Sequence, residues 1–176
     1  LLIMFDDLRP ELSVYGRNVK TPNFERLAAR SVVFDNAYAQ ISVCNPSRDS
    51  LLTGLRPDTI GTYGFQSSFR PHLTIPTRLA RSGYNTAGYG KIAHWESFDR
   101  NVWNFDQWDN SWYVYQNKEV KSMNSSVMPD KVKPEHLFRD YLFASKTIET
   151  LKSISQKPEY FMLGIGFKLP HLAVHV

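Results

Sequence analysis

The chain has 176 residues, of which 42% are hydrophobic and 14% aromatic, and its formal net charge is +4. This length and apolar content are sufficient for one sizeable core and exclude a disordered chain. The charges are scattered without a run of like sign, so we expect neither a nucleic-acid partner nor a membrane surface as partner. No apolar stretch approaches the ~20 residues that a membrane-spanning helix requires.

The first half of the chain predicts strands that alternate with helices. Residues 1–5 form a short apolar run, which predicts a strand buried on both faces, and the run ends in Asp6 and Asp7. Thr21 and Pro22 are typical of a helix start, with apolar positions continuing to residue 31. A second strand is predicted over residues 31–39. Helices follow over residues 46–52 and 76–82, closed by glycines at positions 54 and 83.

The second half continues this alternation. A strand is predicted over residues 84–89, and residues 95–128 indicate a long excursion of loops and short strands. Apolar residues at steps of three and four predict an amphipathic helix over residues 134–154, followed by a buried strand over residues 160–167. Strands alternating with helices predict an α/β fold, with a mostly parallel sheet flanked by helices on both faces, in a single domain.

The only cysteine, Cys44, is the first candidate for chemistry, although a buried cysteine without a function is the simpler alternative. Cys44 lies at the start of a predicted helix, with Pro46 at the helix entry and Arg48 one turn further on. A helix N-terminus stabilises negative charge through its unpaired amides and dipole. Arg48 can bind a tetrahedral oxyanion, or a hydrated aldehyde at position 44, with two parallel hydrogen bonds.

The segment CNPSRDSLLTG, which begins at Cys44, resembles the signature of the formylglycine-dependent sulfatases. The resemblance extends over nearly the whole chain, through the strings MFDDLRP, TPNFERLA, FDNAYAQ, LRPDT, GYGKIAH and GFKLPH. Within this family, DDLRP and RPDT are more similar to the iduronate-2-sulfatase subgroup than to arylsulfatases. The resemblance implies an alkaline-phosphatase/sulfatase-like fold, of which residues 1–176 would be the N-terminal portion of one catalytic domain.

The resemblance also implies a cofactor and a set of site residues. A separate formylglycine-generating enzyme would oxidise Cys44 to formylglycine, whose hydrate attacks the sulfur atom of a sulfate ester. One Ca²⁺ ion would be held by Asp6, Asp7 and the modified Cys44, because calcium prefers several hard oxygen ligands. The alternative for the two aspartates is a helix cap or a turn.

Three further residues receive catalytic roles from the resemblance. Lys91 would bind the sulfate group, and His94 would form a hydrogen bond with the formylglycine hydroxyl. His171 would be the acid that protonates the leaving alcohol, whereas Lys168 does not match the family string and receives no role. Without the resemblance, Lys91 would be a surface lysine and His94 a loop histidine with its hydrogen bonds satisfied.

The implied substrate is a sulfated sugar or glycosaminoglycan, and specifically the 2-sulfate of iduronate in heparan or dermatan sulfate. The family completes its calcium site with an Asp-His or Asp-Asn pair on a later strand, and no strand predicted after Cys44 carries such a pair, so we expect these residues alone to be nearly inactive. An N-glycosylation acceptor at Asn124 gives slight support for a lysosomal or secreted glycoprotein.

Two other functions compete with this interpretation. The first is a phosphohydrolase of the related alkaline-phosphatase type, which would use the same sheet edge with zinc-like metals. The second is a catalytically silent homologue that binds sulfated polysaccharide through a basic and aromatic surface. The Cys-x-Pro-Ser-Arg string argues against the first, and an unmodified Cys44 would favour the second.

Overall fold

The computed structural model describes residues 1–65, 73–94, 105–107 and 139–171. Its elements, in chain order, are β1 (Leu2–Phe5), the 3-10 helix η1 (Ser13–Tyr15), α1 (Pro22–Ala28), α2 (Cys44–Thr53), α3 (Pro57–Ile60), α4 (Ile75–Arg81), β2 (Asn85–Gly90), β3 (Phe105–Gln107), α6 (Arg139–Ile154) and β4 (Phe161–Phe167). No helix among these is long and apolar enough to span a bilayer.

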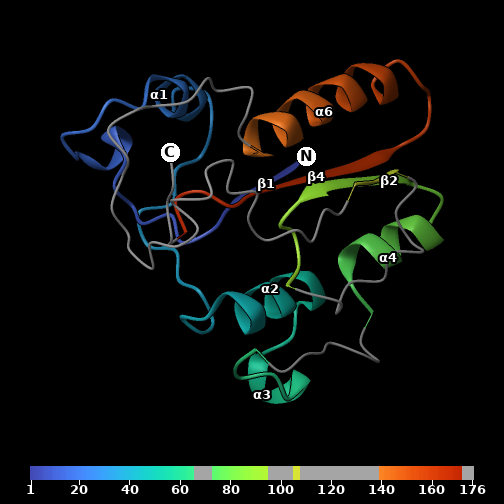
Figure 1. The fold of residues 1–176 in the computed structure, drawn as a ribbon, viewed down its shortest axis with the longest axis horizontal. Helices are drawn as coiled ribbons and strands as arrows, with labels where there is room; N and C mark the ends of the chain where they lie inside the picture. The colour runs from blue at the N-terminus through green and yellow to red at the C-terminus, as the bar shows by residue number, and fades with distance from the viewer. Residues whose placement is uncertain (66–72, 95–104, 108–138, 172–176) are drawn as a thin grey trace, which may run out of the picture.

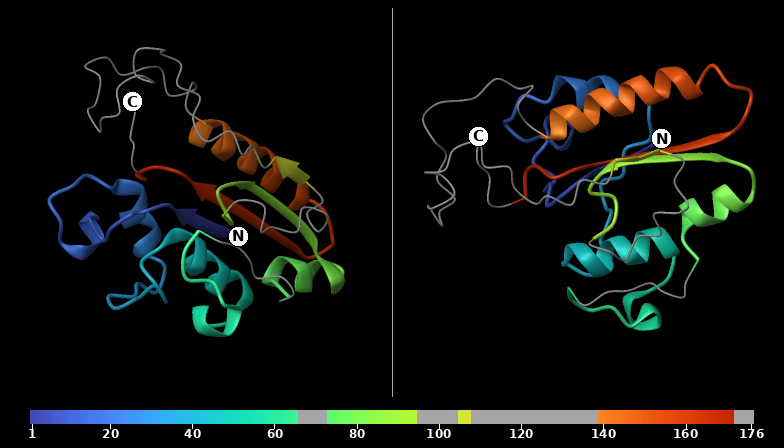
Figure 2. Two further views of the ribbon diagram at one scale, coloured as in Figure 1. Left: turned by 60° about the horizontal axis from the view of Figure 1, so that its bottom comes forward. Right: turned by 45° about the vertical axis from the view of Figure 1, so that its right-hand side comes forward.

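The strands of the described residues form one parallel sheet in the order β1-β4-β2-β3. Helix α6 covers one face of this sheet, and helices α2, α3 and α4 lie on the other, as both Figure 1 and the right-hand view of Figure 2 show. The predicted α/β class, with a parallel sheet between helices, is therefore confirmed.

The strand register brings the carboxyl ends of three strands together. Phe5 of β1 lies opposite Phe167 of β4, and Gly90 of β2 lies opposite Gly166. The amide of Asp6 then donates to the carbonyl of Phe167 at 3.1 Å, and the amide of Lys91 donates to that of Gly166 at 2.7 Å. The residues that follow β1, β2 and β4 consequently meet at one edge of the sheet, where parallel α/β sheets bind their ligands.

Apolar side chains are buried on both sides of the sheet. Between the sheet and α6 the buried residues are Ala87, Tyr89, Ile154 and Leu163. On the opposite side they are Leu52 and Ile60, from α2 and α3, with Ile92 and Ala93 from the segment after β2. The segment after β2 is thus held by burial of its own side chains as well as by the sheet.

Two glycines allow β4 and β2 to approach closely at this edge. A Cβ atom at Gly166 would overlap the backbone carbonyl of Lys91, and a Cβ atom at Gly90 would overlap the carbonyl oxygen of Gly166. Only hydrogen fits at either position, so the two glycines are needed for the backbone of Lys91 to lie where it does.

Two expectations for strands are wrong. Residues 31–39 form no strand, and Phe34 in this segment is 69% exposed. Aromatic and β-branched residues favour a strand only where a neighbouring strand and an apolar face receive them, and this segment meets neither among the described residues. β1 is a strand, but it is not buried on both faces: it pairs only with β4 in the described sheet, and Ile3 is 48% exposed.

The other predicted elements are confirmed with small shifts of their ends. The predicted helix over residues 46–52 begins earlier, at Cys44, and the helices starting at positions 22 and 76 are α1 and α4. The strands predicted over residues 84–89 and 160–167 are β2 and β4. Of the predicted helix over residues 134–154, residues 134–138 lie outside the described residues, as does most of the excursion over residues 95–128.

The close approach at Gly166 makes a testable prediction. Gly166→Ala should lower the free energy of unfolding by about 3 kcal/mol, because the new methyl group forces the backbone of β4 away from Lys91. Gly83→Ala is the matched control: Gly83 has φ +86°, but a Cβ added there would meet no atom within 4 Å, so it should cost only ~1–2 kcal/mol of backbone strain. Urea unfolding measures the stability of both variants. Equal losses of unfolding free energy would contradict the predicted overlap between a Cβ atom at Gly166 and the backbone of Lys91.

Candidate active site

Helix α2 begins at Cys44 and brings Arg48 to the carboxyl edge of the sheet. Val43 precedes the helix with extended backbone, Cys44 is its first residue, and Gly54 ends it with a left-handed φ of 71°. Pro46 lies in the first turn, where its missing N–H removes no intrahelical bond. Cys44 and Arg48 are four residues apart and therefore lie on the same face of α2, with Cys44 half-buried.

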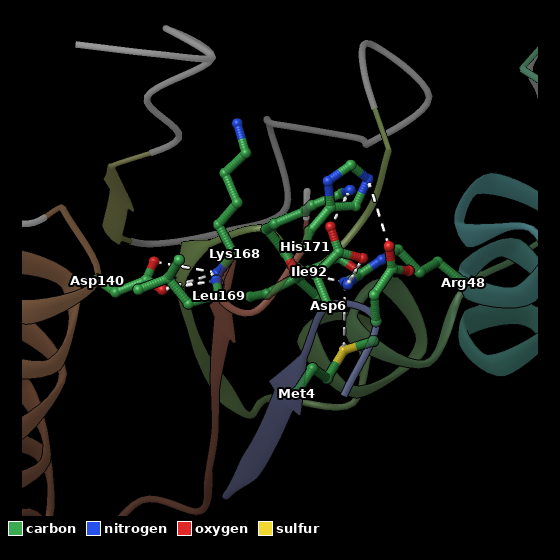
Figure 3. Close-up of polar contacts among 10 residues, drawn as sticks. Met4, Asp6, Arg48, Ile92, Asp140, Lys168, Leu169 and His171 are labelled. Carbon is green, nitrogen blue, oxygen red and sulfur yellow. Dashed lines mark hydrogen bonds and ion pairs between the residues drawn. The ribbon is translucent and has the colours of Figure 1, made fainter. Parts of the chain in front are cut away.

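The carboxylate of Asp6 binds two cations from different elements. Its Oδ1 accepts from Nη2 of Arg48 at 2.9 Å, and its Oδ2 accepts from Nζ of Lys91. The three side chains are 2%, 5% and 10% exposed for Asp6, Arg48 and Lys91 respectively. Figure 3 shows Arg48 reaching from α2 to the end of β1 to make this contact. The structure thus brings together three of the residues predicted from the sequence.

Arg48 also holds the segment that follows β2. Its Nη1 donates to the backbone carbonyl of Ile92 at 3.2 Å and to that of Lys91, and lies 4.0 Å from Sδ of Met4. A single guanidinium therefore joins α2, the end of β1 and the segment that carries Lys91. The guanidinium spreads its donors over separate nitrogens, whereas all the donors of a lysine lie on one nitrogen and would have to reach these acceptors from one point.

The pKa of Asp6 reflects two opposing effects. Burial raises this pKa, whereas the hydrogen bond from Lys91 and the positive charges of Arg48 and Lys91 lower it. The lowering effects are larger in sum, so the pKa lies below its ordinary value of 3.8 and Asp6 is ionised at neutral pH.

Asp7 lies beside Asp6 in sequence but faces a different partner. It adopts a left-handed backbone conformation with φ 57°, which sends consecutive side chains in different directions. Its side chain is 56% exposed, and its Oδ2 lies 3.7 Å from Nε2 of His171. His171 follows β4, so this contact joins the ends of β1 and β4, which are far apart in the sequence.

His94 is buried beside the same cluster. Burial lowers the pKa of His94 to about 4, helped by the positive charges of Lys91 and Arg48 and opposed by Asp6. Its imidazole ring lies 5.4 Å from the ring of Phe65, measured between centroids. At neutral pH the ring is therefore uncharged and can both donate and accept a hydrogen bond.

Asp49, which the sequence analysis did not single out, is a completely buried carboxyl on α2. Burial raises the pKa of Asp49 to about 6, and a hydrogen bond with Thr62 opposes this rise only in part. One turn earlier, Nδ2 of Asn45 donates to the carbonyl of Gly64 at 2.7 Å. Asp49 lies within the CNPSRDSLLTG segment, but no role was assigned to it from the sequence, and its position four residues after Asn45, on the same helix face, is the further signal in the sequence.

The described residues match part of a calcium site and do not complete one. Asp6 and Asp7 supply carboxylate oxygens, the ligand type that calcium prefers, but calcium takes about six to eight of them. No group of three or more His, Cys, Asp or Glu side chains within the described residues is arranged to hold a metal ion. The further ligands would have to come from residues other than those described.

The sequence matches a known family over almost its whole length. The family model described as Sulfatase matches residues 1–174, and the chain belongs to the sulfatase family. Iduronate 2-sulfatase of Mus musculus is 35% identical over 192 residues, covering 98% of this chain and 35% of the relative. The chain thus spans about a third of the length of that relative.

Two solved structures share the fold. One is described as a complex with its substrate D-glucosamine-2-N,6-O-disulfate; it has a TM-score of 0.69, 23% identity, and coverage of 97% of this chain and 34% of that chain. The other is a phosphonate monoester hydrolase of Agrobacterium radiobacter, with a TM-score of 0.67, 18% identity and coverage of 97% and 40%. At these identities the similarity concerns the fold, which is the alkaline-phosphatase/sulfatase type predicted from the sequence.

The contacts of Arg48 lead to a prediction about stability. Arg48→Met should lower the free energy of unfolding by about 3 kcal/mol, because Asp6 keeps only Lys91 and the carbonyl of Ile92 loses its donor. Arg56→Met is the control, since Arg56 pairs with Asp58 at 3.4 Å on the surface and should change stability by less than ~1 kcal/mol. Urea unfolding at pH 7 compares them, and similar losses would argue against the buried cluster.

The raised pKa of Asp49 predicts that the free energy of unfolding depends on pH. Because folding raises its pKa from 3.8 to about 6, its contribution is fully present below pH 3.8 and is lost as the pH rises through about 6. The complete loss of this contribution lowers the free energy of unfolding by roughly 3 kcal/mol. Asp49→Asn cannot ionise, so the variant should gain this amount relative to the wild type between pH 4 and about 7.

Urea unfolding of both proteins across this pH range measures the difference. Asp58→Asn, at an exposed carboxyl of α3, is the control and should follow the wild-type curve. If the curves for Asp49→Asn and the wild type run parallel, Asp49 does not carry its proton in the folded state.

Proposed function

We propose that the protein containing this chain hydrolyses sulfate esters, with formylglycine formed from Cys44 as its nucleophile. The main support is the meeting of Arg48 and Lys91 on Asp6 at the carboxyl edge of the sheet, with Arg48 one helical turn after Cys44 on α2. Two permanent cations beside a helix N-terminus suit a substrate with a doubly or singly charged oxyanion. Family membership and the Cys-x-Pro-Ser-Arg string support the same reaction.

The reaction proceeds in two steps on residue 44. One hydroxyl of the hydrated aldehyde loses its proton and attacks sulfur, and the bond between sulfur and the ester oxygen breaks as the leaving alcohol takes up a proton. The second hydroxyl then loses its proton, the bond from the formylglycine carbon to the sulfate oxygen breaks, and sulfate leaves. The aldehyde is restored, and the net reactants are one ester and one water molecule.

The charges of Lys91, Arg48 and His94 suit the roles that we propose for them. Lys91 and Arg48 bind sulfate oxygens and stabilise the charge that develops on them. His94, which is neutral above about pH 4, forms a hydrogen bond with the formylglycine hydroxyl and can accept its proton. His171 lies on the more open side, near Asp7, and donates a proton to the leaving alcohol.

Calcium is the proposed metal, with Asp6, Asp7 and residue 44 among its ligands. Bound there, a divalent cation would lower the pKa of the hydrate and neutralise charge on the sulfate oxygens. Carboxylates support a hard cation over a soft one. In this arrangement Arg48 and Lys91 keep Asp6 ionised and therefore able to act as a ligand.

The proposed substrate is a sulfated sugar or glycosaminoglycan, and in particular the 2-sulfate of iduronate in heparan or dermatan sulfate. The similarity to iduronate 2-sulfatase and to a structure with a sulfated glucosamine supports this class. The proposed partner for maturation is a formylglycine-generating enzyme, and the proposed location is the lysosome or the secretory route. A phosphohydrolase remains the alternative enzyme, and a silent sulfated-glycan-binding homologue the alternative without catalysis.

The state of Cys44 tests the proposal directly. Tryptic mass spectrometry of the full-length protein should find residue 44 lighter than cysteine by the difference between a CH₂SH and a CHO group. Cys44→Ala should reduce hydrolysis of an aryl sulfate by ~10⁴-fold or more, because the nucleophile is removed. Unmodified Cys44 in protein from its native host would favour the silent homologue.

A comparison of substrates distinguishes a sulfatase from a phosphohydrolase. The wild-type protein should hydrolyse an aryl sulfate faster than the matching aryl phosphate. It should also hydrolyse a disaccharide ending in iduronate 2-sulfate faster than the isomer that carries its sulfate on O6 of the other sugar. A preference for the phosphate would contradict the proposed reaction, whereas a preference for the isomer would contradict only the proposed sugar.

A further inference from the structure

We propose that Asp140 is a positioning residue that holds His171 at the site by anchoring the turn from Lys168 to His171. The role of His171 in this inference rests on the proposed function, but the anchoring contacts do not. Asp140 belongs to α6, on the face of the sheet opposite α2, and none of the sequence motifs includes it.

The carboxylate of Asp140 accepts three hydrogen bonds from the backbone directly after β4. Its Oδ1 and Oδ2 each lie 3.0 Å from the amide nitrogen of Lys168, and its Oδ2 lies 2.9 Å from that of Leu169. Figure 3 shows this carboxylate directed at the two nitrogens, on the opposite side of the β4 end from Arg48. Hydrogen bonds with an ionised acceptor are roughly twice as strong as neutral ones, so these bonds fix the start of the turn.

The end of the same turn carries His171. The amide of His171 donates to the carbonyl of Lys168 at 2.9 Å, which closes the turn over four residues. The imidazole Nε2 then lies 3.7 Å from Oδ2 of Asp7. Asp140 therefore acts on the site indirectly. Its carboxylate anchors the amides of Lys168 and Leu169, these amides begin a closed turn, and the turn carries the imidazole of His171.

Helix α6 gives this anchor a fixed position relative to the sheet. Ile154, Leu151 and Phe143 of α6 pack against β2 and β4, and Oη of Tyr89 lies 2.5 Å from Oγ1 of Thr150. Phe143, one turn after Asp140, lies against Gly90 so closely that a Cβ there would be 3.0 Å from its Cδ2. The end of the helix that carries Asp140 is thus held at the same edge of the sheet as Lys91.

The amides of Lys168 and Leu169 need such an acceptor because they follow the last residue of β4 and leave the strand ladder. Asp140 also lies in the first turn of α6, where a carboxylate is stabilised by the helix dipole. Replacing it leaves two amides for water to solvate and allows the turn to move. A displacement of ~1 Å in a catalytic group can cost about 10²-fold in rate.

The experiment uses the full-length protein with two sulfate esters that differ in their need for an acid. A sugar sulfate has a basic leaving alcohol that requires protonation, whereas nitrophenyl sulfate releases a weakly basic phenolate. Asp140→Ala should lower kcat for the sugar sulfate by ~10²-fold and for the nitrophenyl ester by less than ~5-fold, with KM little changed. Asp140→Asn retains the equivalent of one oxygen and should recover most of the loss.

Two comparisons separate positioning from general damage. In a His171→Ala background, Asp140→Ala should cause no further loss on the sugar sulfate, because the group that it positions is gone. Glu149→Ala is the matched control: Glu149 is a carboxylate on the same helix, exposed and paired with Lys146, and its removal should leave kcat unchanged on both esters. The positioning role would be overturned if Asp140→Ala lowered kcat equally on both esters. It would also be overturned if the losses from Asp140→Ala and His171→Ala on the sugar sulfate added in full.

Hydrogen exchange tests the anchor without any activity. The amides of Lys168 and Leu169 should exchange ~10-fold or more faster in Asp140→Ala than in the wild type, while those in β4 stay protected. Unchanged exchange at both amides would overturn the inference even if sulfate hydrolysis is confirmed. Conversely, faster exchange in a protein without sulfatase activity would support the anchor and count against the proposed function.

Discussion

The structure depends first on the buried carboxylate of Asp6 and the two cations bound to it. An ionised aspartate is costly to bury, and Arg48 and Lys91 offset that cost from α2 and from the segment after β2. Since Arg48 also binds the carbonyl of Ile92, removing Arg48 takes a hydrogen-bond donor from both Asp6 and that carbonyl. The same cluster has one more positive than negative charge, and its two cations are those proposed to bind sulfate.

A second constraint is the close contact between the ends of β2 and β4. Gly90 and Gly166 leave no room for a side chain, so the backbone of Lys91 lies directly against β4. Arg48 can then reach that backbone from α2 on one side, while α6 packs over Gly90 through Phe143 on the other. The glycines have a packing role, which explains their presence in strands where larger residues would otherwise be favoured.

The sheet edge is supported from both of its faces. On one side α2 contributes Arg48, and on the other α6 contributes Asp140, which binds the turn before His171. Each helix uses a charged side chain to hold a loop that follows a strand, so the loops are anchored to rigid elements. Such support is what a site requires if its side chains are to keep one geometry. It also explains how Asp6, Lys91 and His171, from the loops that follow three different strands, come to lie at one edge of the sheet.

The sequence by itself determined the alternation of strands and helices, the family, and the candidates Asp6, Cys44, Arg48 and Lys91, because periodicity, glycine stops and a dense local motif are properties of neighbouring residues. It failed at residues 31–39 and at the burial of β1, since strand formation and exposure depend on partners distant in the chain. Only the tertiary structure could reveal the role of Asp140 and the burial of Asp49. Asp140 is an aspartate in a helix without a motif, and its importance arises from the backbone amides that it meets. Asp49 lies within the cysteine motif, but its complete burial depends on residues distant in the chain.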